Sequence, residues 1–334
     1  MSVTIEDISL RLGISVSTVS KALNAYPDVA KDTREKVLAA ARELDYHPSA
    51  VARNLRRGRA DKIGLLINNP ISFISEYISE VMAGVALGAE TQGQNLVLYT
   101  AAVHHPQELK RICRAREVDG LLLIYSPSPE ATAVLQREKM PFVVFGRRVE
   151  QPGVCFVAPD NRAGAYDLTR HLLEQGHRRI GFTTRPELGA VSEDRYQGYR
   201  QALADAGLAF EPELVVQTKI EPLSGYKAMN GFLDLASPPT AVFAFYDLMA
   251  VDALNAARDR GMRIPEDVAI AGFDGLRSSA ITQPRLTTVQ QPLNPMGKRA
   301  MEILLSRIAD NDQPPITEIF PVHLLIREST EYQR

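Results

Sequence analysis

Residues 4–24 read TIEDISLRLGISVSTVSKALN, and this stretch decides the fold of the first part of the chain. Apolar residues at helical spacing predict a short amphipathic helix, which Gly13 ends because glycine tolerates backbone angles that other residues resist. A second helix is predicted to begin after Ser15, whose hydroxyl can accept a hydrogen bond from a free backbone N–H of the first turn. The apolar positions are Ile5, Ile8, Leu10 and Leu12 in the first helix and Val16, Val19 and Leu23 in the second. The stretch therefore predicts helix, turn and helix.

The face of the second helix that is expected to be exposed carries small hydrogen-bonding groups and one cation. Such side chains suit contact with base edges and phosphates from a helix that lies in a DNA major groove. The same pattern also fits the solvated face of an ordinary helical hairpin, and the pattern alone leaves both interpretations open. The residues of this face are Ser15, Ser17, Thr18, Ser20, Lys21 and Asn24.

A third helix is predicted over residues 31–44, with Val37, Leu38, Ala41 and Leu44 on its inner face. It would complete a small helical head. The segment SAVARNLRR at residues 49–57 follows, and it is short, alanine-rich and basic. On composition alone it is either the first turns of a helix or a solvated basic linker.

The composition predicts a protein of two or three domains without a membrane span. The chain has 334 residues, of which 45% are hydrophobic, and no apolar run reaches the length of about 18 residues that a membrane helix needs. The first ten residues lack the basic and apolar regions of a secretory signal, so we expect a cytoplasmic protein. Cys113 and Cys155 lack metal-ligand spacing, and we expect buried thiols, no metal and no cofactor.

The charge is distributed unevenly along the chain. Residues 1–60 hold ten Lys and Arg against seven Asp and Glu, a net charge of +3, whereas the whole chain carries −2 and the remainder therefore −5. A mildly basic head on an acidic body suits a protein that touches nucleic acid at one end.

From residue 62 onward, short apolar runs alternate with amphipathic segments. The runs are rich in Val, Ile, Leu and Phe without alternation, which is typical of strands buried on both faces. Strand and helix repeated in this way predict an α/β fold with parallel doubly wound sheets, and the number of strands favours two similar lobes with a cleft between them. The expected strands are 63–68, 95–100, 120–125, 142–146, 179–184, 241–245 and 268–273, and the expected helices are 78–92, 162–174, 196–206, 248–260 and 296–308.

Ligands of open parallel sheets bind beyond the carboxyl ends of the strands, so residues that follow strands are candidates for a ligand site. Several have a structural alternative. Asp247 is interpreted first as a helix cap, Asp160 with Asn161 could cap the next helix, Asp274 could stabilise a turn, and Arg195 could be solvated. The candidates are Asn68, Asn69, Tyr99, Tyr125, Ser126, Arg147, Asp160, Arg195, Tyr246, Asp247, Asp274 and Gln291.

Four runs of the head, TIEDI, GISVSTVSKALN, TREKV and YHPSAVARNL, resemble the DNA-binding head of the lactose-repressor (LacI/GalR) family of bacterial transcription regulators. Lys21 departs from the family, which usually has Arg there. The resemblance implies that residues 49–57 are a hinge helix that folds on DNA, with Leu55 wedged between base pairs of the minor groove. The DNA-binding residues that it implies are Thr4, Ser15, Val16, Ser17, Thr18, Ser20, Lys21, Asn24, Tyr46, Ala52, Arg53 and Leu55.

The body resembles the periplasmic sugar-binding-protein fold that this family uses as its effector-binding core. DRYQGY matches the family's R-x-x-G-[FY] motif, GFDG its effector-contacting Asp motif and LTTVQQP one of its crossovers. Tyr246 departs from the family, which usually has Asn, while the first loop and FGR suggest a sugar such as a disaccharide or α-glucoside, with Phe73 and Tyr77 as wall residues. The effector-binding residues that the resemblance implies are Asn69, Tyr125, Arg147, Asp160, Arg195, Tyr246, Asp274 and Gln291.

The resemblance also implies the domain boundaries, because the chain of such a core crosses between its lobes three times. The crossings are expected near residues 159–161, 288–292 and 320–322. The boundaries are 1–48 for the helix-turn-helix head, 49–60 for the hinge helix and linker, 61–159 plus 291–320 for the first lobe, and 160–290 plus 321–334 for the second.

The function implied is that of a transcriptional repressor, which binds a pseudo-palindromic operator as a homodimer and responds to a small-molecule effector. An enzyme is not expected. Carboxylates at residues 160, 194, 247 and 274 could serve acid and base chemistry, but the sequence contains no nucleophile elbow, phosphate-binding glycine loop or HExxH motif. A solute-binding transport protein would share the two-lobed body but would need export and would not need the head.

Overall fold

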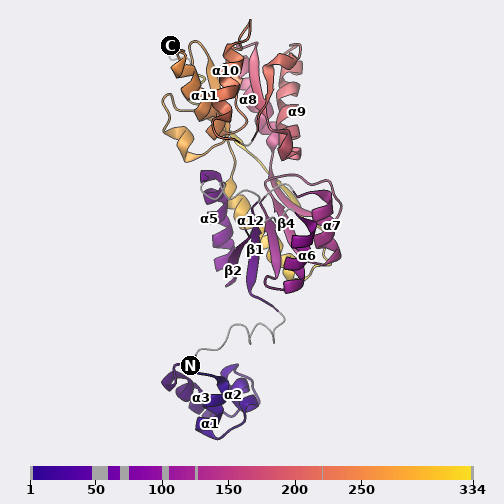
Figure 1. Cartoon of the computed structure of the whole chain (residues 1–334), viewed down its shortest axis with the longest axis vertical. Coiled ribbons are helices and arrows are strands. Elements are labelled where there is room, and N and C mark those ends of the chain that lie inside the picture. Colours follow the sequence, from indigo (N-terminus) through magenta and orange to yellow (C-terminus); the bar gives the residue numbers. More distant parts are fainter. Residues whose placement is uncertain are drawn as a thin grey trace. The chain divides into compact units, whose positions relative to one another are not determined.

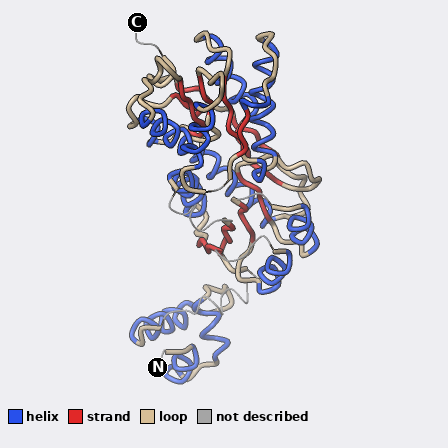
Figure 2. Tube along the Cα trace, turned by 45° about the horizontal axis from the view of Figure 1, so that its top comes forward, coloured by secondary structure: helices blue, strands red, loops and turns tan. Residues whose placement is uncertain are grey.

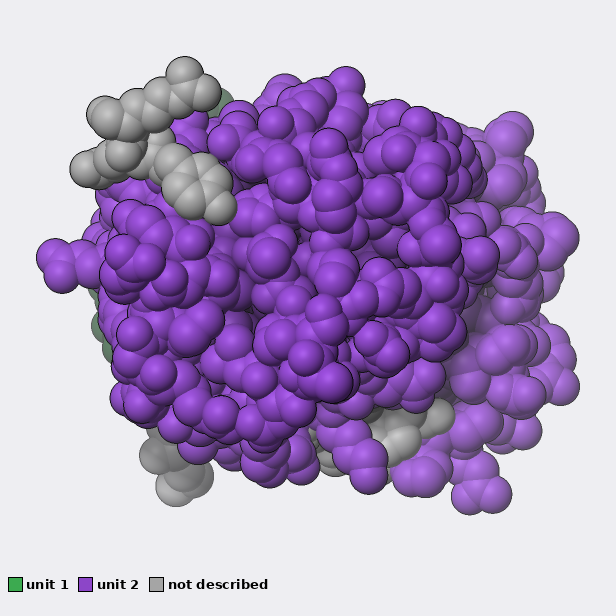
Figure 3. Space-filling view, turned by 90° about the horizontal axis from the view of Figure 1, so that it is seen from above, with its two compact units in different colours: residues 1–60 green, residues 61–334 purple. Residues whose placement is uncertain are grey.

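The computed structural model describes residues 3–46, 59–67, 75–99, 105–124, 127–219 and 221–331. The chain forms two compact units, Met1–Ala60 and Asp61–Arg334, which are coloured separately in Figure 3. Among the described residues, no helix has the length and apolar character needed to cross a membrane.

The first unit is a three-helix head. It consists of α1 (Ile5–Leu12), α2 (Val16–Leu23) and α3 (Lys31–Glu43), as the helix-turn-helix pattern predicts. Their inward residues form one small core of Ile8, Val19, Ala22, Val29, Val37, Ala40 and Ala41. Leu10 does not join this core: its side chain is 82% exposed, so the prediction that it lies on the apolar face of α1 is wrong.

The second unit contains two six-stranded sheets, each with helices on both faces (Figures 1 and 2). Sheet A is parallel throughout, in the order β11-β5-β4-β3-β1-β2. Helices α5 and α12 cover one face, and α6 and α7 cover the other. The bounds are β1 Lys62–Leu66, α5 Glu76–Glu90, β2 Asn95–Tyr99, α6 Pro106–Ala115, β3 Gly120–Leu123, α7 Pro129–Arg137, β4 Phe142–Phe145, β5 Cys155–Pro159, α12 Leu293–Ala309 and β11 Thr317–Phe320.

Sheet B has the order β12-β10-β9-β8-β6-β7, and only its edge strand β12 runs antiparallel to its neighbour. Helices α8 and α9 pack on one face, and α10 and α11 pack on the other. The bounds are α8 Asn161–Glu174, β6 Ile180–Thr184, α9 Ala190–Asp205, β7 Val215–Gln217, α10 Ser224–Leu233, β8 Ala241–Phe243, α11 Asp247–Asp259, β9 Ala269–Asp274, β10 Thr287–Gln290 and β12 His323–Leu325, with 3-10 turns η2 Pro186–Leu188, η3 Pro212–Leu214 and η4 Arg277–Ala280.

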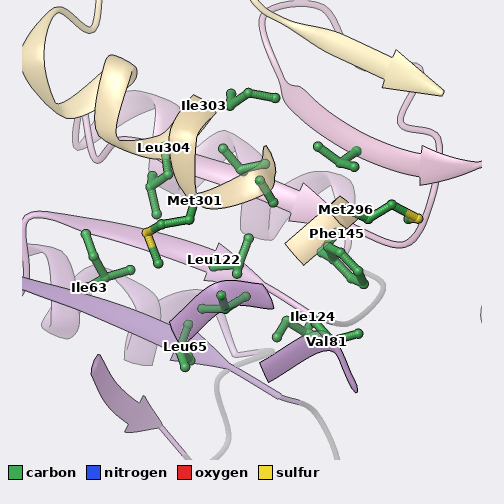
Figure 4. Close-up of a cluster of buried hydrophobic side chains, with 14 of the residues drawn as sticks. Ile63, Leu65, Val81, Leu122, Ile124, Phe145, Met296, Met301, Ile303 and Leu304 are labelled. Carbon is green, nitrogen blue, oxygen red and sulfur yellow. The ribbon is translucent and has the colours of Figure 1, made fainter. Parts of the chain in front are cut away.

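Six of the seven apolar runs become inner strands of the two sheets, whereas the run at 95–100 becomes the edge strand β2, which is only partly buried, so the prediction that it is buried on both faces is wrong. Figure 4 shows how β1, β3 and β4 present Ile63, Leu122 and Phe145 to Met301 and other side chains of α12. Each of these residues is at most 2% exposed. Burial of this kind contributes about 25 cal/mol per Å² of apolar surface, so these layers provide much of the stability of the lobe.

The chain passes between the two sheets three times. It leaves β5 of sheet A at Pro159 and enters α8 at Asn161, and it leaves β10 of sheet B at Gln290 and enters α12 at Leu293. The last passage joins β11 to β12. Each lobe is therefore built from separate stretches of sequence.

Gly84 allows a test of how closely α5 and α12 pack against each other on sheet A. A Cβ added to Gly84 in α5 would lie 2.0 Å from the backbone oxygen of Asn294 in α12, so Gly84→Ala must push the two helices apart. Overpacking of this kind costs about 1–3 kcal/mol. We expect the free energy of unfolding, measured by urea denaturation, to fall by that amount.

The matched control is Gly231→Ala in α10, where an added Cβ meets nothing within 4 Å. Alanine is the better helix former by about 0.5–1 kcal/mol, so this variant is expected to gain stability. An equal effect of both substitutions would contradict the close approach of α5 and α12.

Candidate ligand site and nucleic-acid interface

The turn between α1 and α2 is fixed by local interactions. Gly13 adopts φ +63°, in the left-handed region, and ends α1. The hydroxyl of Ser15 accepts a hydrogen bond from the backbone N–H of Thr18 at 3.0 Å, which confirms the predicted N-cap of α2. This cap satisfies one of the free donors at the helix start and fixes where α2 begins.

The exposed surface of α2 and its caps carries six of the twelve predicted DNA-binding residues. Ser15, Val16, Ser17, Lys21 and the C-cap residue Asn24 are exposed, and Thr18 is partly exposed. Val16 is 41% exposed, so an apolar side chain lies on the surface of this small unit.

Ser20 differs from the expectation. It is 7% exposed, because it follows Val19 on the inward side of α2, and the prediction that it lies on the exposed face is wrong. Thr4 is exposed at the N-cap of α1, while Tyr46 packs against the core of the head. Ala52, Arg53 and Leu55 lie outside the described residues.

Lys21 already has an ionic partner within the head. Its Nζ lies 2.5 Å from Oδ2 of Asp28, and both side chains are about half exposed. The hydrogen bond to Asp28 raises the pKa of Lys21, and the same bond lowers the pKa of Asp28. A phosphate placed near α2 would therefore compete with Asp28 for this cation.

In the second unit, Arg195 is the centre of a buried polar cluster. It lies within α9, 4% exposed, and not in a solvated first turn. Its Nε donates to Oδ1 of Asn161 at 2.9 Å, and its Nη1 donates to the backbone oxygen of Phe245. The ring centroids of Phe245 and Phe273 lie 4.6 and 3.7 Å from its guanidinium carbon.

Asp274 and Gln291 complete this group, which we call the Arg195 cluster. Oδ1 of Asp274 lies 3.7 Å from Nη2 of Arg195 and accepts a hydrogen bond from Nε2 of Gln291 at 2.7 Å. Burial raises the pKa of Asp274, while Arg195 opposes that rise and Asp247 adds to it. The buried cation and anion thus stabilise one another where neither could remain charged alone.

The carboxylate of Asp247 is structural, but it does not cap a helix. Helix α11 begins at Asp247 itself, after Tyr246 as the N-cap residue, so the predicted capping role is wrong. Its Oδ2 accepts from the backbone N–H of Leu276 at 2.8 Å, and its Oδ1 accepts from the hydroxyl of Thr288. Asp160, in contrast, does cap α8, through its Oδ1 and the N–H of Ala163 at 2.9 Å.

Arg185 belongs beside this cluster, although sequence reasoning missed it. Its Nη1 donates to the hydroxyl of Tyr246 at 2.8 Å, and its guanidinium carbon lies 5.4 Å from that ring's centroid. It is 4% exposed and directly follows β6. The rule that residues after parallel strands approach ligands would have included it.

Several contacts join the two lobes near the cluster. Glu76 accepts from the backbone N–H of Ser278, Nη1 of Arg147 donates to the oxygen of Leu188 at 3.0 Å, and Nη2 of Arg148 donates to Asp194 at 3.0 Å. Leu276, which follows β9 of sheet B, packs into the apolar core of the sheet A lobe. Tyr77 of α5 interacts electrostatically with Asp274, Arg195 and Arg147, and burial raises the pKa of its hydroxyl.

Three buried polar atoms have no hydrogen-bond partner among the described residues and lie in or beside the cluster. They are Nε of Arg147, Nη2 of Arg185 and Oε1 of Gln291. Unpartnered buried donors and acceptors are uncommon in proteins, and they are the groups that a bound polar ligand would satisfy. Of the predicted effector residues, Asn69 and Tyr125 lie outside the described residues. In the part of the chain that is described, no group of three His, Cys, Asp or Glu is arranged to hold a metal ion.

Comparisons with known proteins match both units. The model of bacterial regulatory proteins of the lacI family matches residues 4–49, and that of the periplasmic binding protein-like domain matches residues 169–330. The chain is 34% identical over 334 residues to the HTH-type transcriptional repressor CytR of Escherichia coli (strain K12). This alignment covers 98% of this chain and 96% of that relative.

Two solved structures are similar over nearly the whole chain. The complex of the transcriptional regulator CelR with cellobiose has 32% identity and a TM-score of 0.75, and the alignment covers 98% of this chain and 99% of that one. The lac repressor dimer bound to operator and the anti-inducer ONPF has 25% identity and a TM-score of 0.85, with 99% of each chain covered.

The buried carboxylate of Asp247 predicts a pH dependence of stability. Burial raises its pKa to about 7, so the folded chain keeps a proton that the unfolded chain has lost. The unfolding free energy is therefore expected to fall as pH rises between about 4 and about 7. Asp247→Asn removes one titrating group, and its slope of unfolding free energy against pH should be less negative, by at most about 1.4 kcal/mol per pH unit.

Urea denaturation at a series of pH values measures this slope. Loss of the hydrogen bonds of Asp247 would lower the unfolding free energy equally at every pH. Only the loss of its titration would change the slope. Identical slopes for the parent and the variant would show that Asp247 titrates normally.

Proposed function

Because the chain belongs to the lacI family of bacterial regulatory proteins, we propose that it represses transcription by binding a pseudo-palindromic operator as a homodimer, under the control of a small-molecule effector. That it is a DNA-binding transcriptional regulator follows from its similarity to the repressor CytR over 98% of its length. The observation that carries the proposal is the combination, in one chain, of a helix-turn-helix head and a two-lobed core with a buried polar cluster.

The exposed side of α2 is the surface proposed to enter the major groove. Val16, Ser17 and Lys21 are proposed to contact base edges, with Ser15, Thr18 and Asn24 beside them and Thr4 and Tyr46 near the backbone. Ser20 is removed from the contact set because it is buried in the head. Phosphate contacts should provide most of the affinity, which makes binding steeply dependent on salt.

Residues 49–60 are proposed to link the head, residues 1–48, to the core. The predicted hinge helix at residues 49–57 has nine residues, which are too few for a stable isolated helix in water, so coupling of its folding to DNA binding is physically reasonable. In this proposal, Ala52, Arg53 and Leu55 contact the minor groove, where an apolar wedge opens a base step.

The effector is proposed to bind between the lobes, 61–159 plus 291–320 and 160–290 plus 321–334. The CelR structure contains cellobiose, and the lac repressor structure contains an anti-inducer, which supports a carbohydrate-like effector here. A ligand that changes how the lobes meet would alter operator affinity by a typical coupling of about 1–3 kcal/mol. The residues proposed to contact it are Asn69, Tyr125, Arg147, Asp160, Arg195, Tyr246, Asp274 and Gln291.

No catalytic role is proposed for the chain, since the relatives described above are regulators. The cluster's carboxylates support this view, because Asp274 is paired with Arg195 and Gln291 and Asp247 is bonded to backbone and hydroxyl groups. The place of action is then the cytoplasm, where the bacterial chromosome lies.

Selection from a randomised DNA pool, followed by fluorescence anisotropy on the enriched site, tests the proposal with the full chain. We expect tight binding that weakens steeply with salt and that one member of a panel of mono- and disaccharides reverses or strengthens. Arg195→Gln should keep the DNA affinity and lose the response to the sugar, since only the core is altered. Failure to enrich any site from the pool would contradict the DNA-binding function.

The ion pair of the head gives a second prediction. Asp28→Asn releases Lys21 from its partner, so operator affinity at low salt should rise. Lys21→Gln should lower it, and the slope of log affinity against log salt should decrease by about one. Anisotropy at several salt concentrations measures both.

The control is Glu43→Gln, which makes the same charge change at the ion pair of Arg11 with Glu43. Its effect on operator affinity should be smaller than that of Asp28→Asn. If the two substitutions acted equally, the gain would come from net charge and not from the position of Lys21 on α2.

A further inference from the structure

Arg147 is a partly buried cation without a carboxylate partner. Its Nη1 donates to a neutral acceptor, the backbone oxygen of Leu188, and its Nε has no hydrogen-bond partner among the described residues. Burial lowers the pKa of this guanidinium to about 10, and among the described residues the hydroxyl of Tyr77 opposes this shift. An isolated buried charge is costly, so its environment is incomplete as it stands.

The sequence shows that no acidic residue is missing from this environment. The residues outside the described ranges, among them 68–74 (NNPISFI), 100–104 (TAAVH) and 125–126 (YS), include no Asp or Glu. Every carboxylate side chain of the protein therefore belongs to the described part of the chain, and none of these forms an ion pair with Arg147. A negative charge that balances Arg147 would therefore have to come from outside the chain.

Arg185 brings a second guanidinium to the same short turn. It directly precedes η2, whose last residue, Leu188, holds Arg147 through its backbone oxygen. Its Nε lies 3.2 Å from Glu187, a side chain that is 39% exposed, and its buried Nη2 has no partner in the described structure. Arg147 and Arg185 follow β4 and β6 respectively, so both stand at carboxyl ends of parallel strands.

The groups of the site offer a ligand two kinds of contact, one to a positive charge and one to a neutral hydrogen-bond acceptor. Asp274 balances Arg195, which leaves the positive charge of Arg147 uncompensated. Oε1 of Gln291, in contrast, is a neutral acceptor that a ligand hydroxyl would satisfy. Guanidinium groups bind carboxylate and phosphate oxygens in charge-assisted hydrogen bonds, which are about twice as strong as neutral ones.

We propose that the effector carries an oxyanion, as a sugar acid or a sugar phosphate does, and that Arg147 and Arg185 bind that group while the Arg195 cluster binds the hydroxyls. This inference rests on the effector site proposed above. The proposed class of effector is then an anionic sugar and not a neutral one.

Inorganic phosphate is the first probe, and thermal unfolding of the full chain is the measurement. The midpoint is compared in sodium phosphate and in sodium chloride at equal ionic strength. We expect phosphate to raise the midpoint of the parent, and Arg147→Gln and Arg185→Gln each to lose about half of that rise or more. Arg148→Gln is the matched control, because the neighbouring Arg148 is already paired with Asp194 and Glu150, and it should keep the rise.

An equal rise in all four proteins would mean that phosphate acts through the solvent or an adventitious site only, and the inference would fail. It would fail as well if phosphate did not raise the midpoint of the parent. Without phosphate, Arg147→Gln should unfold at the temperature of the parent or above, since it removes an unbalanced charge. A clear loss of stability there would assign Arg147 a structural role and overturn the proposal.

Calorimetry with glucose, glucuronate and glucose 6-phosphate then identifies the oxyanion. We expect one of the two anions to bind at least about tenfold more tightly than glucose, and Arg147→Gln to remove that preference. A neutral sugar that binds the parent and Arg147→Gln equally, and that still alters DNA binding, would overturn this inference and leave the proposed function intact. Loss of DNA binding in the pool experiment would instead remove the function itself.

Discussion

The buried guanidinium of Arg195 is the interaction on which the arrangement of the sheet B lobe depends. A charge that is 4% exposed must be paired and hydrogen-bonded, and its partners are Asn161 at the start of α8, the oxygen of Phe245 after β8 and Asp274 at the end of β9. These groups come from three separate elements. The requirement to satisfy one cation thus fixes how the carboxyl ends of the strands lie relative to one another.

In the part of the chain that is described, the side-chain contacts between the lobes are, in contrast, individually weak. Arg148 and Asp194 have side chains that are 39% and 19% exposed, and a pair of this kind contributes at most about 1 kcal/mol. The hydrogen bonds of Glu76 and Arg147 to backbone groups are of similar size, and Leu276 adds a small apolar contact. Each of these contacts is therefore no stronger than what a small ligand can supply.

Sequence reasoning identified most strands from their apolar runs, but it missed the buried strands β5 and β10 and three edge strands. Runs such as GLLL and FVVF gave the inner strands β3 and β4, because a strand covered on both faces must be apolar throughout. The edge strands β7, β11 and β12 are only partly buried, so their sequences show no such run. Family motifs led to Arg195, Asp274 and Gln291, which do meet. The strand-end rule would have added Arg185, but the lack of a partner for its Nη2 depends on tertiary packing that no short pattern records, as does the burial of Ser20.

The three passages of the chain between the sheets have a consequence for how such a gene can change. The sheet A lobe takes its first strands from one end of the core and α12 and β11 from the other, with most of sheet B encoded between them. A single recombination event between two related genes cannot exchange one complete lobe. It would join half of one lobe to half of a foreign one, so the ligand specificity of the core evolves more readily by substitutions at its inner surface than by exchange of modules.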